Sequence, residues 1–527
     1  MSILTVATFL GFTGFVGLVS WLRTRHEKLD SQVGYFLGGR SLTGVLIAGS
    51  MLMTNISTEH LVGMNGAAYK NGFIVIAWEV TSALALILAA IYFIPKYLRM
   101  GLTTIPEYLE NRFDAATRTW VAILLVISFA VTLLPIVLYT GAINLESIFN
   151  VSDTLGVSDQ EGLWITVLVI GVLGSVYAIF GGLKGVAVSD TLYGYGLLIG
   201  GLLVPLLALI DIGNGNPIEG MATVFKNNPE KFNVIGAPDS VMPFETLFTG
   251  LVINQIYFWC MNQSIIQRAF GAKNLIEAQK GLLLTGVLKI FVPVIIILPG
   301  VIGYYYFGDS LYATQDLIYP ELVKKVLPIG FAGFFAAVVM GAVLSTFNGV
   351  LNSAATIFSI DVYQRLFNTQ AGDRKSVRVG KITASILAVA AIITAPFVAN
   401  APEGMYQLLQ QLNGIFFIPI ASIMLGGFFF KTISATGAKV ALVVGLVFYV
   451  VTTFILQVDI HFIHIWGIEF LLNVGIMFLF SYLYPAKKSF EIRDMKAVEL
   501  KGWKYTNAMS VALVVITVAI YILLGNV

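Results

Sequence analysis

Charged residues are scarce in this chain of 527 residues, in which Asp, Glu, Lys and Arg together reach 11%, against roughly 25% in soluble proteins. Hydrophobic residues make up 57%, too many for a surface that faces water on all sides. The net charge of +2 provides no strong basic field for binding a nucleic acid. These scarcities exclude an ordinary soluble domain and indicate a protein that crosses a lipid bilayer several times.

Cysteine is nearly absent as well. The single residue, Cys260, excludes an internal disulfide framework, and its apolar surroundings favour a small packing residue over a catalytic thiol. The chain also lacks a glycine-rich phosphate loop, a zinc-ligand cluster and a nucleophile elbow. We therefore expect neither an enzyme nor a bound organic cofactor.

Long apolar segments fill most of the chain. About 20 apolar residues suffice for a membrane-spanning helix. The fourteen segments that meet this requirement are 3–22, 43–66, 73–98, 118–147, 161–180, 187–210, 244–268, 279–306, 328–364, 378–399, 405–429, 435–456, 462–484 and 504–524. The first segment is too long and too poorly flanked for a cleaved signal peptide. The sequence thus predicts an all-α polytopic membrane protein of about fourteen transmembrane helices in a single domain.

Lys and Arg are distributed unevenly among the connections between these segments. Alternate connections, beginning with the one after the first helix, hold most of them. The other connections hold only Lys70, Lys226, Lys231, Lys324 and Lys325. By the positive-inside rule the basic connections are cytoplasmic. We therefore expect a multi-pass protein of the cell membrane with both termini on the extracytoplasmic side.

Polar residues interrupt two of the apolar segments. Thr54-Asn-Ile-Ser-Thr-Glu-His60 lies in the second segment, and Val252-Ile-Asn-Gln-Ile-Tyr-Phe-Trp-Cys-Met-Asn-Gln263 lies in the seventh. A helix satisfies its own backbone in lipid, so such clusters indicate discontinuous helices whose free carbonyls and side chains bind ions or substrate. Because the two segments are five helices apart, they also suggest an inverted repeat with a site at mid-membrane. The simpler alternative for either stretch alone is hydrogen bonding between helices.

Hydroxyl groups gather in the ninth segment, where Ala342, Ser345 and Thr346 share one helix face at i, i+3 and i+4. With free carbonyls they would form an uncharged oxygen cage that suits a monovalent cation. The alternative is that the hydroxyls bond back to the preceding turn. Glu79 and Lys289 add charges at membrane depth, where charged side chains line bundle interiors or aqueous cavities.

Five motifs occur in a fixed order between residues 35 and 445. They are Ile105-Pro-Glu-Tyr-Leu-Glu-Asn-Arg-Phe113, Phe180-Gly-Gly-Leu-Lys-Gly-Val-Ala-Val-Ser-Asp190, Asn262-Gln-Ser-Ile-Ile-Gln-Arg268, Leu351-Asn-Ser-Ala-Ala-Thr-Ile-Phe-Ser-Ile-Asp-Val-Tyr363 and Lys431-Thr-Ile-Ser-Ala-Thr-Gly-Ala438. This set resembles the sodium:solute symporter family, and its sodium/sugar cotransporter branch in particular. The resemblance implies a leucine-transporter-like core of two inverted five-helix repeats, 43–210 and 244–429. An extra helix, 3–22, would precede this core, and additional helices within 435–524 would follow it.

The resemblance also implies roles for individual residues. The sodium site would consist of the carbonyls of Met53, Ile56 and Ala342 and the hydroxyls of Ser345 and Thr346. Asp190 matches a residue on the sodium exit route. The substrate-binding positions would be Asn55, His60, Glu79, Ser82, Gln255, Lys289 and Gln410. The gate positions would be Phe258 and Trp259 on the inner side, with Met64 and Phe416 on the outer side.

Three positions depart from the bacterial galactose carrier of this branch. Phe258 replaces a tyrosine, Gln255 replaces an asparagine, and His60 stands where that carrier has glutamine but the animal glucose carriers have histidine. We predict sodium-driven symport of a neutral, hexose-like sugar, with the sugar, sodium and the bilayer as partners and no nucleic acid. The alternatives are a symporter of the same family for an inositol, a sialic acid, a carboxylate or an amino acid, and a membrane sensor without transport activity.

Overall fold

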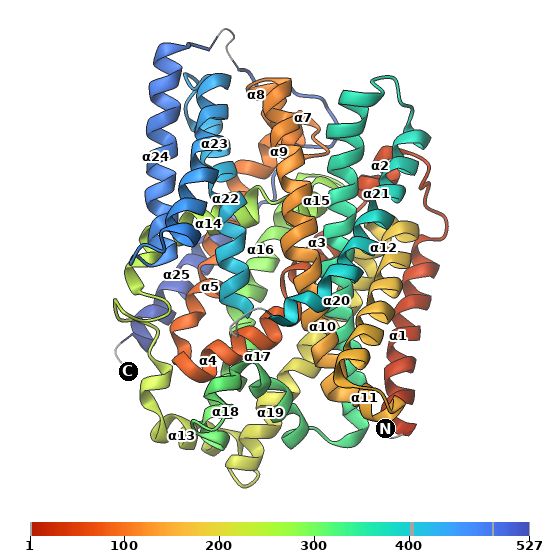
Figure 1. Cartoon of the computed structure of the whole chain (residues 1–527), viewed down its shortest axis with the longest axis vertical. Helices are drawn as coiled ribbons and strands as arrows, with labels where there is room; N and C mark the ends of the chain where they lie inside the picture. Colours follow the sequence, from red (N-terminus) through yellow and green to blue (C-terminus); the bar gives the residue numbers. More distant parts are fainter. Residues whose placement is uncertain (1–2, 401–404, 487–489, 526–527) are drawn as a thin grey trace.

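Helices make up the regular structure in the described part of the chain, residues 3–400, 405–486 and 490–525 of the computed structural model (Figure 1). Within these ranges the only strand-like pairing is an isolated bridge between Leu42 and Ala272. The all-α class predicted from the sequence is therefore confirmed.

The first half of the chain begins with a peripheral helix and continues through several short segments joined end to end. Its elements are α1 (Ile3–Thr24), α2 (Gln32–Leu37), α3 (Gly44–Asn55), η2 (Glu59–Met64), α4 (Asn65–Asn71), η3 (Gly72–Ile76), α5 (Ala77–Val80), α6 (Ser82–Leu88), η4 (Ala89–Phe93), α7 (Ile94–Met100), α8 (Ile105–Arg112), α9 (Ala115–Ser128), η5 (Phe129–Leu133), α10 (Leu134–Phe149), α11 (Val151–Leu155), α12 (Asp159–Ile212) and α13 (Pro217–Asn227).

The second half repeats the pattern of short and long helices. Its elements are η7 (Phe244–Phe248), α14 (Gly250–Cys260), α15 (Gln263–Phe270), α16 (Leu275–Phe291), α17 (Pro293–Ile296), α18 (Leu298–Phe307), η8 (Tyr312–Leu317), α19 (Ile318–Val326), α20 (Ile329–Ile357), η9 (Phe358–Phe367), α21 (Asp373–Thr394), α22 (Met405–Phe429), α23 (Ala435–Val450), η11 (Val451–Ile455), α24 (Phe462–Leu483) and α25 (Thr506–Leu524).

Backbone breaks interrupt both segments that carry polar clusters. The helical stretch that starts at α3 stops at Asn55, because Ile56 is extended with φ −90° and ψ 91°. The stretch that starts at α14 stops at Cys260, and α15 begins where the Asn262 side chain accepts a hydrogen bond from the Ser264 backbone N–H at 3.0 Å. This is an N-cap, which ends one helix and starts the next. The two predicted discontinuities are therefore confirmed.

Fewer spans are recognisable as continuous helices than the fourteen predicted. Ten stretches within the described residues are long and apolar enough to cross a bilayer, and Leu275–Phe291 with Pro293–Phe307 forms one more, bent by 40°. Part of the difference arises in α12, whose 54 residues cover two predicted spans on either side of Gly182, with φ 57°. Breaks elsewhere leave segments too short to qualify singly, such as α3 with 12 residues. The multi-pass class is confirmed, and the number fourteen stays a prediction.

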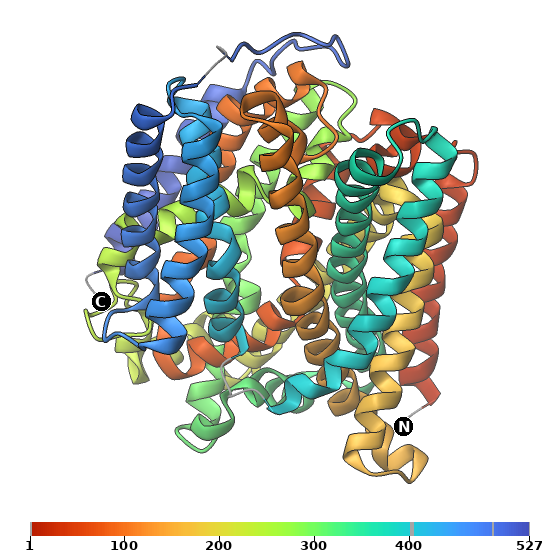
Figure 2. The ribbon, with the colours of Figure 1, turned by 45° about the horizontal axis from the view of Figure 1, so that its top comes forward.

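The long helix α20 lies at the centre of the molecule and is almost wholly buried. It packs against α1, α10, α12 and α21, and also against α3 near its break. The pair α23 and α24 lies side by side at one flank, while α1 lies at the opposite flank (Figure 2). The broken segment that begins at α3 therefore packs against α20 and against α15, the second half of the other broken segment.

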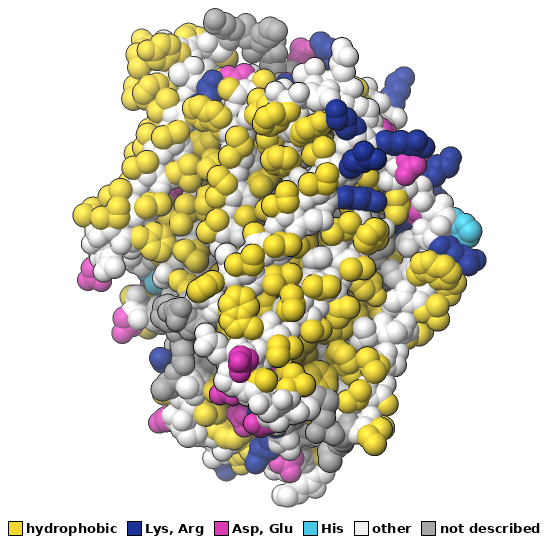
Figure 3. Space-filling view, turned by 45° about the vertical axis from the view of Figure 1, so that its right-hand side comes forward, with side chains coloured by type: hydrophobic (Ala, Val, Ile, Leu, Met, Phe, Trp, Pro, Cys, Tyr) yellow, Lys and Arg dark blue, Asp and Glu magenta, His cyan; other side chains and the backbone are white. Residues whose placement is uncertain are grey.

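Exposed basic side chains gather at one end of the molecule, here called the basic face and defined by Arg25, Arg374, Lys375 and Arg378. Figure 3 shows Lys and Arg side chains along this end, next to a broad apolar band. Such a band flanked by charge is expected of a protein embedded in a bilayer.

Candidate functional site

A central cavity lies where the two broken helices meet. The residues that line it include Thr54, Asn55, Glu59, His60, Trp78, Glu79, Ser82, Asn254, Gln255, Phe258, Trp259, Lys289, Thr346, Tyr406, Gln410, Asn413 and Phe417. All seven predicted substrate-binding residues are among them, although they come from five separate parts of the sequence. The structure thus brings together the set that the family resemblance indicated.

A buried ion pair lies in this cavity. The Lys289 ammonium on α16 contacts the Glu79 carboxylate on α5, and each side chain is 1% exposed. The same ammonium donates a hydrogen bond of 2.7 Å to Asn55 Oδ1, the last residue of α3. His60 Nε2 lies 3.9 Å from Glu79 Oε1. The pairing matters because an isolated charge at this depth would be very costly to bury.

Amide and hydroxyl groups continue the network from α14. Gln255 Oε1 accepts hydrogen bonds of 3.1 Å from both the Ser82 hydroxyl and the Trp259 indole N–H. Gln255 Nε2 donates to the Trp78 carbonyl at 2.7 Å. Lys289 Nζ lies 5.6 Å from the centre of the Trp259 ring, within the range of a cation–π contact. The cavity therefore offers both donors and acceptors beside aromatic faces.

Glu59 and Asn254 are among the polar cavity residues that were not predicted as site residues. Glu59 is 2% exposed and its Oε2 makes no hydrogen bond to a described residue. Asn254, one residue before Gln255, likewise has an unpartnered Oδ1. The polar stretch Thr54–His60 contained the signal for Glu59, but the family resemblance gave no reason to single it out.

Aromatic rings close one side of the cavity. The Tyr406 ring packs edge-on against His60 at 5.0 Å and against Trp78 at 5.7 Å between ring centres. Met64 lies beyond them in a smaller second cavity that Trp78 and Tyr406 also line. Phe416, which was predicted for the outer side, lines neither cavity, because the cavity-facing residue is its neighbour Phe417. Trp78 and Tyr406 therefore line both cavities, and the gate roles of Met64 and Phe416 stay predictions.

The predicted cation ligands meet where α20 crosses the end of α3. Thr346 Oγ1 lies 3.3 Å from the Met53 carbonyl and 3.0 Å from the Thr54 carbonyl. Ser345 and Ala342 are buried on the same helix, and Ile56 is buried at the break of the facing segment. This arrangement places hydroxyls from one helix beside carbonyls freed by the break in another.

Asp190 of α12 lies next to this cluster. Its Oδ2 accepts a hydrogen bond of 2.6 Å from the Ser50 hydroxyl, and Ser345 faces the same carboxylate. The fully buried Arg268 donates to the Ser50 and Thr54 hydroxyls at 3.2 Å and 2.9 Å. A methyl group built on Gly349 would lie 2.3 Å from Arg268 Nη2, so a larger residue there would require the guanidinium group to shift.

The two glutamines of the Asn262–Arg268 motif fasten α15 to its neighbours. Gln263 Oε1 accepts from the Ile105 backbone N–H at 2.8 Å, and its Nε2 donates to the Thr103 carbonyl at 3.1 Å. Gln267 Nε2 donates to Asn352 Oδ1 and Thr356 Oγ1, each at 3.0 Å. The motif therefore holds the second half of a broken helix against the α7–α8 connection and α20.

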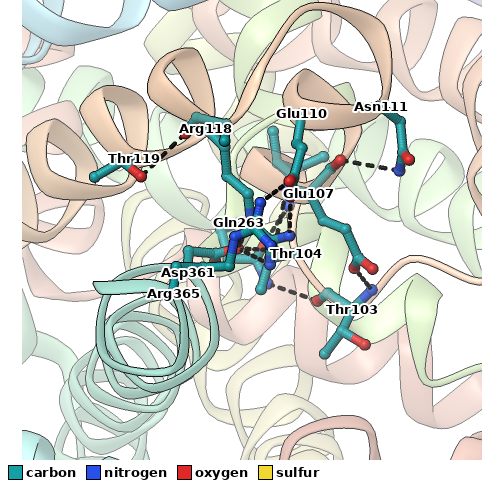
Figure 4. Close-up of polar contacts among 12 residues, drawn as sticks. Thr103, Thr104, Glu107, Glu110, Asn111, Arg118, Thr119, Gln263, Asp361 and Arg365 are labelled. Carbon is teal, nitrogen blue, oxygen red and sulfur yellow. Dashed lines mark hydrogen bonds and ion pairs between the residues drawn. The ribbon is translucent and has the colours of Figure 1, made fainter. Parts of the chain in front are cut away.

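A charge network lies beside Gln263 and joins two more of the motif segments, 105–113 and 351–363 (Figure 4). Asp361 Oδ1 on η9 accepts from Arg118 Nε at 2.6 Å and from the Thr104 hydroxyl at 2.9 Å. Arg118 also pairs with Glu110 at 2.6 Å, and Arg365 contacts the same carboxylate. These contacts, called the latch below, connect α8, α9 and η9.

The arrangement of broken helices is similar to that of two solved transporters. The substrate-bound, outward-open structure of a Na+-coupled sialic acid symporter gives a TM-score of 0.78 at 20% identity, over 92% of this chain and 99% of the other. MHP1, a nucleobase-cation-symport-1 family transporter in a closed conformation, gives 0.57 at 15% identity, over 90% and 97%. The fold is therefore that of a leucine-transporter-like symporter.

The sequence itself matches the family model of the sodium:solute symporters over residues 35–445. An uncharacterized symporter of Escherichia coli (strain K12), YidK, is 42% identical over 99% of this chain and 91% of its own length. The sodium/glucose cotransporter of Vibrio parahaemolyticus is 30% identical, over 82% of each chain. The human sodium/myo-inositol cotransporter is 30% identical, over 77% of this chain and 60% of its own length. The chain belongs to the sodium:solute symporter family and is a sodium-coupled transporter rather than an enzyme.

Proposed function

We propose that this symporter carries a neutral sugar or cyclic polyol into the cell together with sodium. The observation that supports this most directly is the paired charge of Glu79 and Lys289 within a cavity of amides and hydroxyls. A polyhydroxy solute both donates and accepts hydrogen bonds, and this mixture of side chains can satisfy both roles. Glu59 adds a second carboxylate to the cavity, which disfavours an anionic solute such as a sialic acid or a carboxylate.

Sodium, in this proposal, is held by the Met53, Ile56 and Ala342 carbonyls and by the Ser345 and Thr346 hydroxyls. The close approach of Thr346 to the Met53 carbonyl supports the assignment. An ion bound there would fix the end of α3 against α20, and Asn55, the last residue of α3, contacts Lys289 in the cavity. Sodium would thereby order the solute site, and by linkage each ligand raises the affinity for the other by the same factor.

In alternating access the cavity would be closed at one end while it is open at the other, and the transport cycle would switch the two ends. Residues 43–210 and 244–429 act as the two inverted repeats in this proposal, with the basic face and the latch on the cytoplasmic side and both termini outside. Trp78 and Tyr406 would open toward the outside, whereas Phe258 and Trp259 would move with α14 for release to the inside. Asp190 would receive sodium as it leaves Ser345, which it faces.

The deciding experiment is a solute panel with purified protein in proteoliposomes under an imposed inward sodium gradient. The panel contains hexoses, myo-inositol, a sialic acid, a monocarboxylate and neutral amino acids, and uptake is compared with that in a sodium-free gradient. We expect sodium-dependent uptake of a hexose or an inositol, and none of the anions. Preferred uptake of an anion would overturn the substrate proposal, and binding without flux for every solute would favour a sensor.

A further inference from the structure

A carboxyl group lies buried in the flank of the molecule, away from the substrate cavity. Glu469 is in the second turn of α24 and is 0% exposed. It faces α23 at Gly445, where an added methyl group would lie 3.0 Å from Glu469 Oε1 and 2.5 Å from Asn473 Nδ2. Glu469 does not line the central cavity, and nothing in the proposed transport cycle uses it.

Among the described residues that pack around this carboxyl group, none offers it an unpaired positive charge. Helices α14 and α22, which pack against α24, contain no Asp, Glu, Lys, Arg or His. On α23, Lys439 pairs with Asp114 at 2.7 Å. On α24 itself, His464 Nδ1 hydrogen-bonds with the Thr249 hydroxyl at 3.0 Å. The remaining titratable group that faces Glu469 is the Tyr449 hydroxyl, which donates to the Gln411 carbonyl at 3.1 Å.

Several polar atoms around Glu469 lack hydrogen-bond partners among the described residues. Neither carboxylate oxygen makes a well-aligned hydrogen bond, although the Asn473 amide lies beside the group. Asn473 Nδ2 donates to the Ser422 hydroxyl at 3.3 Å. Asn473 Oδ1 accepts no hydrogen bond from a described residue. Thr453 Oγ1 and Trp466 Nε1 make no well-aligned hydrogen bond to a described residue either, although both lie beside the Tyr449 hydroxyl. An ionised carboxylate in such a place would be buried without compensation, which costs several kcal/mol or more.

We propose that Glu469 is a proton-binding site. A proton taken from water neutralises the carboxyl group, and the resulting O–H donates a hydrogen bond to Asn473 Oδ1. Proton binding removes the buried charge and satisfies an orphaned acceptor at once. The competing explanation is that the carboxylate is ionised and holds a monovalent cation. The experiment below separates the two explanations.

The proton site is connected to the substrate cavity through aromatic packing. Trp466, one turn before Glu469, packs edge-on against Trp78 at 6.2 Å between ring centres. Its indole N–H and the Tyr449 hydroxyl lie against Gly414 on α22, next to the cavity residue Asn413. Loss of the proton would draw water between α22, α23 and α24, and would therefore disturb the helix that carries Tyr406 and Gln410.

Infrared spectroscopy of the purified full-length protein in lipid nanodiscs tests the proposal. A protonated carboxyl group gives a C=O stretching band that is distinct from the carboxylate bands and shifts in D2O. We expect Glu469→Gln to remove one such band, because glutamine has no carboxyl group, while its neutral amide mimics the protonated acid in the fold. The exposed control Glu245→Gln should leave the band unchanged. Identical spectra for the wild type and Glu469→Gln would overturn the proposal.

Transport measurements with the same variant distinguish a proton from a metal cation. If Glu469 holds a proton, Glu469→Gln should keep sodium-dependent uptake and its half-saturating sodium concentration within about twofold of the wild type. A rise of about tenfold or more in that concentration would show that the carboxylate holds sodium. Should Glu469→Gln fail to fold, Glu469→Asp retains an acid, and a shifted rather than an unchanged band then assigns the proton.

Discussion

At the scale of single residues, the Glu79–Lys289 pair combines a structural and a functional role. Both side chains are 1% exposed, so removing one partner leaves the other as an uncompensated buried charge. Removal of both charges together should be tolerated better than removal of either one. The pair therefore provides a way to separate folding from transport.

We expect Lys289→Met to destabilise the protein by about 3–5 kcal/mol, and Glu79→Gln/Lys289→Met to recover part of this loss. Thermal unfolding in detergent would measure both effects, with Lys324→Met as a control, because Lys324 belongs to an exposed pair with Glu321. Uptake should be lost in the single and the double variant alike. Restored transport in the double variant would remove the pair from the substrate site.

Asp114 offers a test of pH dependence outside the membrane-spanning segments. Burial raises the pKa of Asp114. Hydrogen bonds from Lys439 and Thr117 lower this pKa by more than burial raises it, so the pKa lies below its usual value. The ionised Asp114 carboxylate therefore stabilises the folded protein above the unfolded pKa of about 3.9, and this stabilisation is lost as the pH falls through the folded pKa.

Asp114→Ala should consequently melt at a lower temperature than the wild type at pH 7, in part because it removes an N-cap worth about 1 kcal/mol. The difference in melting temperature should shrink as the pH falls below the unfolded pKa of about 3.9 and through the lower folded pKa, because the wild-type carboxylate then becomes protonated. Asp239→Asn, in an exposed loop, is the matched control. A difference that stays constant across this range would show that the Lys439 contact contributes nothing.

At the scale of elements, the crossing of α3 and α20 carries the proposed coupling between ion and solute. Ser345→Ala combined with Thr346→Ala removes two of the five assigned sodium ligands. It should abolish sodium-dependent uptake while the fold, measured by thermal unfolding, is retained. Ser353→Ala, two turns further along α20, serves as a control on the same helix. Sodium dependence that survived the double change would refute the ion-site assignment.

The latch makes a second prediction at this scale, because Arg118 and Asp361 join α9 to η9 beside the segment fastened by Gln263. Arg118→Gln should weaken closure at the basic face and favour states open there. A thiol placed by Ser353→Cys, at a hydroxyl that contacts Gln267 at 2.8 Å, would report this opening. We expect faster reaction with a water-soluble maleimide in the Arg118→Gln background, and an unchanged rate would show that the latch is only structural.

Sequence patterns predicted these elements better than they predicted the side chains that face the cavity. The clusters Thr54–His60 and 252–263 located both breaks. Polar residues at membrane depth are costly, and such clusters can be recognised from the local sequence alone. Trp78 and Tyr406 were missed because an aromatic residue in an apolar helix has the same pattern whether it faces lipid, core or cavity. Phe417 lines the central cavity and its neighbour Phe416 does not, since one residue along a helix turns the side chain by about 100°.

At the scale of the whole molecule, the charge that moves with the solute can be measured. A neutral solute moving with sodium carries positive charge inward, and each charge gains about 2.3 kcal/mol per 100 mV. An inside-negative potential of about 100 mV should thus raise the accumulation ratio by up to about fiftyfold for each sodium ion. A potassium diffusion potential in proteoliposomes provides the measurement. Accumulation that ignores the potential would indicate an anionic solute or a compensating ion.

The overall architecture was predictable because it follows from a few strong rules. Apolar segments, the asymmetry of Lys and Arg, and the motif order indicated a multi-pass symporter before any contact was known. The charge network around Glu110 and Asp361, and the isolated carboxyl group of Glu469, could not be foreseen. Such groups become informative only when their neighbours are known, and those neighbours are far apart in the sequence.

Gly349 shows how the space of one methyl group can limit the paths open to evolution. An added side chain there would displace the Arg268 guanidinium, and a smaller residue at 268 would take its positive charge away from the buried Asp190. A change at either site is therefore expected to disturb the other. Selection for revertants of Gly349→Ala should yield second changes at or beside Arg268, rather than ones scattered over the chain.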